Sequence, residues 1–193
     1  NLLQVKQFGK TAPPRSVNSP CILHYDKTSP TLMDDARLGA YLQALETLRF
    51  DPIGRVAYLV ESPEPGVHLL RAELPLEEGV GCPGDHARRH APGREVSAMS
   101  LEVLRALRVR LEVPGDNLIL EGIDLRALRP GDRLLVGEVV LERSDRLHQP
   151  CATFRARTSP EAFEAVAQTG LRGALFTVRK GGVVHVGDPV RKL

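Results

Sequence analysis

Aromatic side chains and excess charge are both scarce in this chain. Of its 193 residues none is tryptophan, and aromatic residues make up only 4%. The 26 basic and 24 acidic residues leave a net charge of just +2. Proteins that bind nucleic acid need a basic face for the phosphates, and those that bind single strands also stack the bases on aromatic rings. We therefore expect no nucleic acid among the partners of this protein.

Cysteines and long apolar runs are also few. The three cysteines, Cys21, Cys82 and Cys151, form no Cys-x-x-Cys pair, which fits a reducing compartment better than a secreted disulfide framework. No apolar stretch approaches the roughly 20 residues that span a bilayer, and the N-terminal segment lacks the apolar core of a secretory signal. These absences predict a cytoplasmic protein with no membrane partner.

Short apolar runs of the kind that form β-strands follow one another from Gly54 onward. The hydrophobic content of 42% is enough for the core of one domain. Clusters of Gly, Pro and Asp separate the runs, as expected for turns between strands. The runs lie at residues 55–60, 67–74, 117–120, 133–143, 175–179 and 183–186, followed by Val190. They predict a mainly β, mixed α+β fold, built as a small barrel or sandwich with a few peripheral helices.

Three segments have helical patterns. Leucines on one face predict an amphipathic helix after Thr31 and Asp34, whose spacing resembles a capping box. A second helix is predicted over residues 100–107. A third is expected to begin with Ser159 as N-cap, with proline at the first helical position, and to end at Gly170.

The composition changes along the chain. Residues 1 to about 30 are rich in Pro, Ser, Thr and Lys and are typical of an arm with little structure of its own. We therefore divide the chain into an N-terminal arm with its amphipathic helix, residues 1–53, and a β domain, residues 54–193.

Cys151 is the residue whose position most favours chemistry. The run 133–143 is predicted to be one strand with a bulge or bend at Gly137. The proline before Cys151 places the cysteine at the start of the next predicted strand, 152–155, near a barrel rim. A thiolate there can act as a nucleophile or as a soft ligand for a transition metal. A nucleophilic pair with His148 is an alternative, although neighbouring strand residues seldom face each other.

The loop 81–90 combines glycines, histidines and arginines. One interpretation is a zinc site formed by Cys82, His86 and His90, which the Pro-Gly step after Cys82 disfavours because it interrupts the helix that would align them. Another is an anion site in which backbone N–H groups, His86 and a neighbouring arginine face a phosphate. A solvated loop without a ligand is the third.

Three further polar residues, Arg94, Ser97 and Asn117, border predicted strands. Side chains of these types can hold a phosphate or a fused heterocycle by hydrogen bonds. Asn117 follows a Pro-Gly-Asp step, so a simple turn residue is the other interpretation. The chain contains neither a Gly-x-Ser-x-Gly nucleophile elbow nor a Gly-x-Gly-x-x-Gly or Walker-type phosphate loop.

Several short motifs follow one another in a distinctive order. They are Gly84-Asp85-His86, Arg94-Glu95-Val96-Ser97-Ala98-Met99-Ser100, Asn117-Leu118-Ile119-Leu120-Glu121-Gly122-Ile123-Asp124-Leu125, Leu128-Arg129-Pro130-Gly131-Asp132-Arg133-Leu134, Gly137, Pro150-Cys151, Gly170-Leu171-Arg172-Gly173 and Gly187-Asp188. This order and spacing closely resemble the MOSC domain, the module at the carboxyl end of molybdenum-cofactor sulfurases. The resemblance covers roughly residues 55–190 and identifies the chain as a stand-alone, bacterial-type member.

The resemblance implies a MOSC-type β-barrel and a role for Cys151. In relatives that reduce N-hydroxylated compounds, the matching cysteine is thought to ligate molybdenum of the pterin cofactor, whereas in sulfurases it is proposed to carry sulfur as a persulfide. The same resemblance implies that the pterin or its phosphate is held by Arg94, Ser97 and Asn117. It also implies that His86 and Arg172 line the same rim.

Two departures from the family pattern bear on function. Amidoxime-reducing relatives commonly have an arginine two residues before the asparagine, where this chain has Gly115. Sulfurases also carry a pyridoxal-phosphate-dependent desulfurase domain, for which this chain is too short.

These departures leave three hypotheses open. The first is a reductase with bound molybdenum cofactor, a small-molecule substrate and a flavin or iron-sulfur protein as electron donor. The second is a sulfur carrier for the assembly of metal-sulfur cofactors, served by a partner cysteine desulfurase that would hold the pyridoxal phosphate. The third is a binding domain that has kept the fold and lost the chemistry.

Overall fold

The structure is a computed structural model that describes residues 33–86 and 92–193. The arm predicted for residues 1–30 lies outside the described residues. Cys21 also lies outside them, as do Thr31, which is part of the helix prediction, and His90, which is part of the zinc prediction. Within the described part, no helix is long and apolar enough to cross a membrane.

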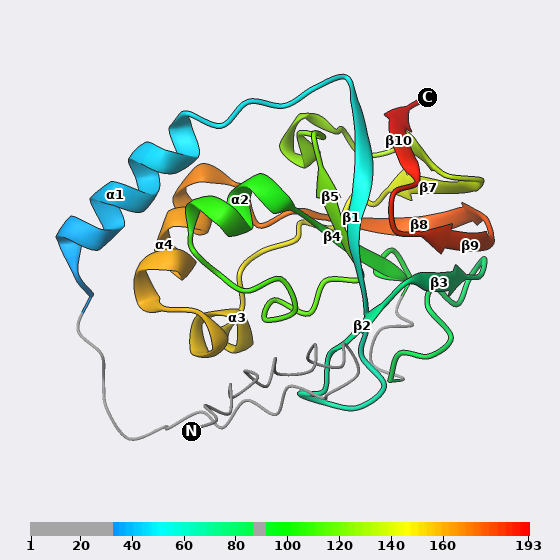
Figure 1. The fold of residues 1–193 in the computed structure, drawn as a ribbon, viewed down its shortest axis with the longest axis horizontal. Coiled ribbons are helices and arrows are strands. Elements are labelled where there is room, and N and C mark those ends of the chain that lie inside the picture. The colour runs from blue at the N-terminus through cyan, green and yellow to red at the C-terminus, as the bar shows by residue number, and fades with distance from the viewer. Residues whose placement is uncertain (1–32, 87–91) are drawn as a thin grey trace, which may run out of the picture.

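Seven strands of the described residues close into a barrel (Figure 1). They are hydrogen-bonded in the order β10, β6, β7, β8, β4, β5 and β1, and β1 pairs back onto β10. Each pair in this ring is antiparallel except β4 with β5. In chain order the strands are β1 (Ile53–Glu61), β4 (Val96–Ser100), β5 (Leu118–Glu121), β6 (Arg133–Val136), β7 (Val139–Arg143), β8 (Ala174–Lys180) and β10 (Pro189–Lys192). The predicted mainly β-barrel fold is confirmed.

Three short strands lie outside this ring. The strand β2 (Leu69–Arg71) pairs with the end of β1, and β3 (Glu73–Leu76) pairs with β9 (Gly182–His185) as a separate ribbon. The prediction of one strand over 67–74 was therefore wrong, because the chain passes from one sheet to another between β2 and β3.

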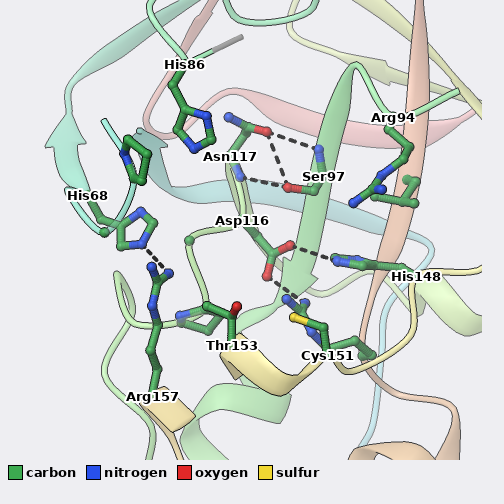
Figure 2. A pocket seen from close by; sticks show the side chains of 16 residues that line it. His68, His86, Arg94, Ser97, Asp116, Asn117, His148, Cys151, Thr153 and Arg157 are labelled. Carbon is green, nitrogen blue, oxygen red and sulfur yellow. Dashed lines mark hydrogen bonds and ion pairs between the residues drawn. The ribbon is translucent and has the colours of Figure 1, made fainter. Parts of the chain in front are cut away.

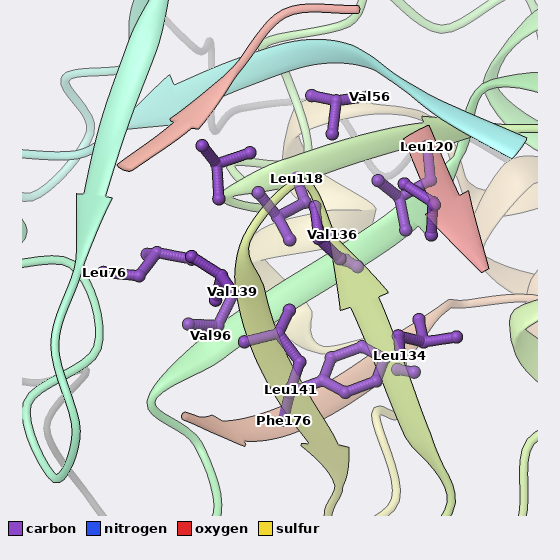
Figure 3. Packing of buried hydrophobic residues seen from close by; sticks show 14 of the residues in the cluster. Val56, Leu76, Val96, Leu118, Leu120, Leu134, Val136, Val139, Leu141 and Phe176 are labelled. Atoms are coloured by element: carbon purple, nitrogen blue, oxygen red, sulfur yellow. The ribbon is translucent and has the colours of Figure 1, made fainter. Parts of the chain in front are cut away.

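Apolar residues fill the barrel and also cover one side of it. On β5, Leu118 and Leu120 belong to the cluster inside the barrel, whereas Ile119 between them belongs to a second cluster under the helices. This alternation is the two-residue period of a strand buried on both faces. Figure 3 shows the interior cluster, with Leu134 and Phe176 from β6 and β8. The interior of the barrel is therefore filled by apolar side chains.

The helices gather on one side of the barrel (Figure 1). They are α1 (Asp35–Glu46), α2 (Leu101–Ala106), α3 (Ala152–Arg157) and α4 (Pro160–Thr169), with a 3₁₀ turn, η2 (Leu125–Ala127), elsewhere. The predicted caps of α4 are confirmed, since Ser159 Oγ accepts a hydrogen bond from Ala162 N and Gly170 ends the helix at φ 68°. Asp34 caps α1 in the same way.

Two predictions around the candidate cysteine were wrong. The run 133–143 is not one bulged strand but the hairpin of β6 and β7, with Gly137 at φ 57° in its tight turn. Residues 152–155 are not a strand but the first part of α3. Cys151 itself is the N-cap of α3. Its backbone is extended, and its Sγ accepts a hydrogen bond from Phe154 N at 3.4 Å. This contact satisfies an amide of the first helical turn.

Candidate functional site

All six residues that the family resemblance implicates line a single cavity at the rim of the barrel. The cavity has a volume of about 300 Å³ and is formed by loops before β4, β5 and α3 and by the segment between α4 and β8. The six residues are Cys151, Arg94, Ser97, Asn117, His86 and Arg172. Figure 2 shows most of them around the same space, together with residues that the sequence did not mark.

Cys151 presents its sulfur at this cavity. The residue is exposed and forms no disulfide. Cys151 is the N-cap of α3, and the hydrogen bond that Sγ accepts from Phe154 N at 3.4 Å orients the thiol. Phe154 is itself buried in the cluster under the helices. An accessible sulfur on a fixed support is suited to metal ligation or to carrying a sulfur atom.

A buried ion pair lies behind the cysteine. Arg172 Nη1 donates to Asp116 Oδ2 at 2.7 Å, and both side chains are almost fully buried. The guanidinium also lies over the Phe154 ring, at 4.6 Å from its centroid, a cation–π contact. The pair thus links the segment before β8 to the segment before β5 and to α3.

His148 adds a neutral ring to this group. Its Nε2 lies 3.4 Å from Asp116 Oδ1 (Figure 2). Burial and the nearby Arg172 lower the pKa of His148 from 6.5 to about 3, and the opposing effect of Asp116 is too small to reverse this. At neutral pH the ring is therefore uncharged and a weak base. A nucleophilic pair in which His148 deprotonates Cys151 is not favoured by this environment.

The lowered pKa of His148 gives the protein a specific response to acid. Between pH 6.5 and about 3 the unfolded chain binds a proton at His148 that the folded chain excludes. We therefore expect the free energy of unfolding to fall as the pH decreases through this window, with a contribution from His148 approaching about 1.4 kcal/mol per pH unit. Urea unfolding from pH 7 to 4 should show a shallower slope in His148→Gln. Equal slopes in the two proteins would contradict the neutral state, as would a His148 ring resonance that titrates near pH 6.5.

A hydrogen-bond network forms the opposite wall. Asn117 Oδ1 accepts from Ser97 N at 3.1 Å and from Ser97 Oγ at 3.3 Å. Its Nδ2 donates to Asp85 Oδ2 at 2.7 Å, and Asp85 Oδ1 accepts from Ser62 N at 2.6 Å. The side chain of Asn117 thus holds β4, β5 and the loop after residue 81 together. Asn117 is therefore not a simple turn residue, which was the other interpretation of its sequence context.

Arg94 and His86 are placed more openly. Arg94 is exposed at the cavity and has no hydrogen-bond or ion-pair partner among the described residues. His86 is half-buried and is anchored through its backbone N–H, which donates to Ser62 O. Both side chains are therefore available to a ligand in the cavity.

The zinc interpretation of the loop 81–90 gains no support from the residues described. Among the described residues, no group of three His, Cys, Asp or Glu side chains could hold a metal ion. Cys82 is buried in the barrel cluster, and burial together with Asp85 raises the pKa of its thiol to about 12. At neutral pH it stays a thiol, which is a poor metal ligand.

The sequence did not mark three residues that the cavity contains: Asp116, His68 and Arg157. Asp116 pairs with Arg172, and His68 binds Arg157 (Figure 2). Each contact joins segments far apart in the chain, so no local pattern could have revealed it. Among the cavity residues are three arginines and one carboxylate, the buried Asp116. The cavity thus suits an anionic ligand.

Comparisons with known proteins identify the family and the fold. The sequence matches the MOSC domain over residues 85–191. YuaD from Bacillus subtilis is 22% identical, with coverage of 72% of this chain and 94% of that chain at a TM-score of 0.55. YiiM from Geobacillus stearothermophilus is 19% identical, with coverage of 72% and 75% at a TM-score of 0.56. YiiM from Escherichia coli is 21% identical, with coverage of 72% and 69% at a TM-score of 0.54. These structures share the fold, and no curated protein matches the sequence.

Proposed function

The chain belongs to the MOSC domain family, and from this premise we propose that it binds the molybdenum cofactor at Cys151 and reduces N-hydroxylated compounds. The observation that carries the proposal is the exposed sulfur of Cys151 at a cavity that contains three arginines. A soft thiolate ligand and an anion-binding wall are what a metal carried on a phosphorylated organic molecule requires.

The residues present fit such a group. Two buried nitrogens of cavity residues, Arg172 Nε and His148 Nδ1, have no hydrogen-bond partner among residues 33–86 and 92–193. Buried polar atoms of this kind are costly unless an acceptor or donor reaches them. Among the described residues no three side chains could hold a metal by themselves. A metal at Cys151 therefore needs further ligands, which a cofactor that carries the metal supplies.

Each residue then has a role. Cys151 would be the metal ligand, Arg94 and Ser97 would bind the pterin or its phosphate, and Asn117 would hold Ser97 in place. His86 and Arg172 would complete the rim.

The reaction itself needs two electrons from outside. Bound molybdenum would supply the chemistry that removes oxygen from the substrate nitrogen. Reduction of an N–OH group consumes two electrons and two protons and releases water. Since the proposal gives this chain no redox centre besides molybdenum, the electrons would come from a partner flavin or iron-sulfur protein.

Metal analysis tests the proposal directly. Protein made in a host with intact cofactor synthesis should contain close to one molybdenum per chain. Cys151→Ser should lower this content by about ten-fold or more, because it removes the only protein ligand proposed. Cys82→Ala is the matched control, since it removes a thiol buried in the barrel and should leave the molybdenum content unchanged. Reduced viologen can replace the partner in an assay of N-hydroxylated bases.

A second candidate function is favoured by the exposure of the same sulfur. A carrier must offer its sulfur to a partner, and Cys151 is exposed. In that case the protein would contain no molybdenum, and a cyanide-labile sulfur would be lost in Cys151→Ser. The donor would then be a separate pyridoxal-phosphate-dependent desulfurase. Absence of both signals would contradict both functions and leave a binding domain without chemistry.

A further inference from the structure

Arg157 and His68 lie in the cavity and have no role in the function proposed above. Arg157 is the last residue of α3, the helix that Cys151 caps. Its Nη1 is hydrogen-bonded to His68 Nε2, and His68 Nδ1 lies 2.8 Å from Ser62 Oγ. His68 and Ser62 are both buried, so the ring is fixed from behind.

The chemistry of the partners fixes the state of the ring. A guanidinium has donors only, so His68 Nε2 must be the acceptor of the Arg157 hydrogen bond. The ring proton therefore sits on Nδ1 and is donated to Ser62 Oγ. The imidazole is neutral in this arrangement. Its contact with Arg157 orients the guanidinium without cancelling its charge.

Gly115 provides the space for this ring. The glycine has φ +72°, and a Cβ built on it would lie 2.4 Å from Cε1 of His68. Any side chain at this position would thus displace the imidazole. His68 therefore occupies the space that a side chain at position 115 would fill, and its Nε2 contacts the guanidinium of Arg157.

We propose that Arg157, positioned by His68 and Ser62, binds a phosphate group of the ligand whose other end reaches Cys151. The two residues stand six positions apart on one short helix, about 9 Å along its axis at 1.5 Å per residue. The ligand class is therefore a phosphorylated molecule with a thiolate-seeking group at the opposite end. This assignment rests on the proposed function for the identity of the ligand, but the anion site itself can be tested alone.

The test is calorimetric titration of the cofactor-free full chain with inorganic phosphate at low ionic strength. Arg157→Gln keeps a donor for His68 Nε2 and removes the charge, so it should weaken phosphate binding about ten-fold or more. Arg155→Gln is the matched control: it lies on the same helix, is exposed over the Phe163 ring, and should change the affinity less than two-fold.

The positioning role of His68 has its own comparison. His68→Leu should weaken phosphate binding several-fold, since the guanidinium loses the acceptor that orients it. His68→Gln offers an amide oxygen to Arg157 and should restore most of the affinity. A loss that is equal in both variants would contradict the positioning role. Thermal unfolding of each variant shows whether the fold is kept.

The outcomes separate this inference from the proposed function. If Arg157→Gln and Arg155→Gln bind phosphate equally, or the wild type does not bind it, the inference is wrong, even where molybdenum is present and depends on Cys151. If phosphate binding depends on Arg157 but no molybdenum is found, the anion site stands and the proposed function fails. In protein that does carry molybdenum, Arg157→Gln should also lower the copurifying organic phosphate.

Discussion

Replacement of Arg172 by leucine should lower the free energy of unfolding by about 3–5 kcal/mol, a large part of the stability of a domain of this size. The loss is expected because the carboxylate of Asp116 remains buried when its partner Arg172 is removed. Asp116 is 1% exposed, and its Oδ2 accepts from Arg172 Nη1 at 2.7 Å. Without the guanidinium the carboxylate stays buried beside a neutral imidazole. Urea unfolding at pH 7 measures the loss.

Two variants show whether the buried charge is the cause. Asp116→Asn combined with Arg172→Leu removes both charges and should recover part of the stability that the single change loses. Arg179→Leu breaks an exposed ion pair with Glu142 and should cost less than about 1 kcal/mol. If Arg172→Leu lowers the free energy of unfolding no more than Arg179→Leu does, Arg172 is not needed to stabilise the buried charge of Asp116.

The fold was predictable where local chemistry determines it. The helix α4 begins with a serine cap and a proline and ends with a glycine at positive φ, so its whole length is visible in the sequence. The helix α3 was missed for two physical reasons. It has only six residues, fewer than two turns, and its cap is Cys151 rather than Ser, Thr, Asp or Asn. The hairpin at Gly137 was missed because its apolar run continues across the turn.

The candidate site was predictable only in part. The order of motifs resembling the MOSC domain marked Cys151, Arg94 and Arg172, and the structure places them at one cavity. Asp116 and Arg157 could not be found in this way. Their partners Arg172 and His68 lie 56 and 89 residues away in the chain, so only the closed barrel brings them together. The electrostatics of the cavity are therefore a property of the fold rather than of a local motif.

The glycine beside Arg172 should not tolerate replacement by alanine. Gly173 has φ +105°, and a Cβ there would lie 2.1 Å from the backbone oxygen of Ala98. Ala98 is paired with Ala174 between β4 and β8, so neither backbone can move without opening the barrel. We expect Gly173→Ala to cost at least about 4 kcal/mol and to leave little folded protein. Circular dichroism and urea unfolding provide the measurement.

Gly170→Ala is the control that isolates the close approach from the backbone conformation. Gly170 also has positive φ, +68°, but an added Cβ would meet nothing within 4 Å. Its replacement should therefore cost only the strain of a left-handed alanine, about 1–2 kcal/mol. Similar losses in the two variants would show that β4 can yield at Ala98. A much larger loss in Gly173→Ala would show that the close approach to Ala98 O, rather than positive φ alone, requires glycine at this position.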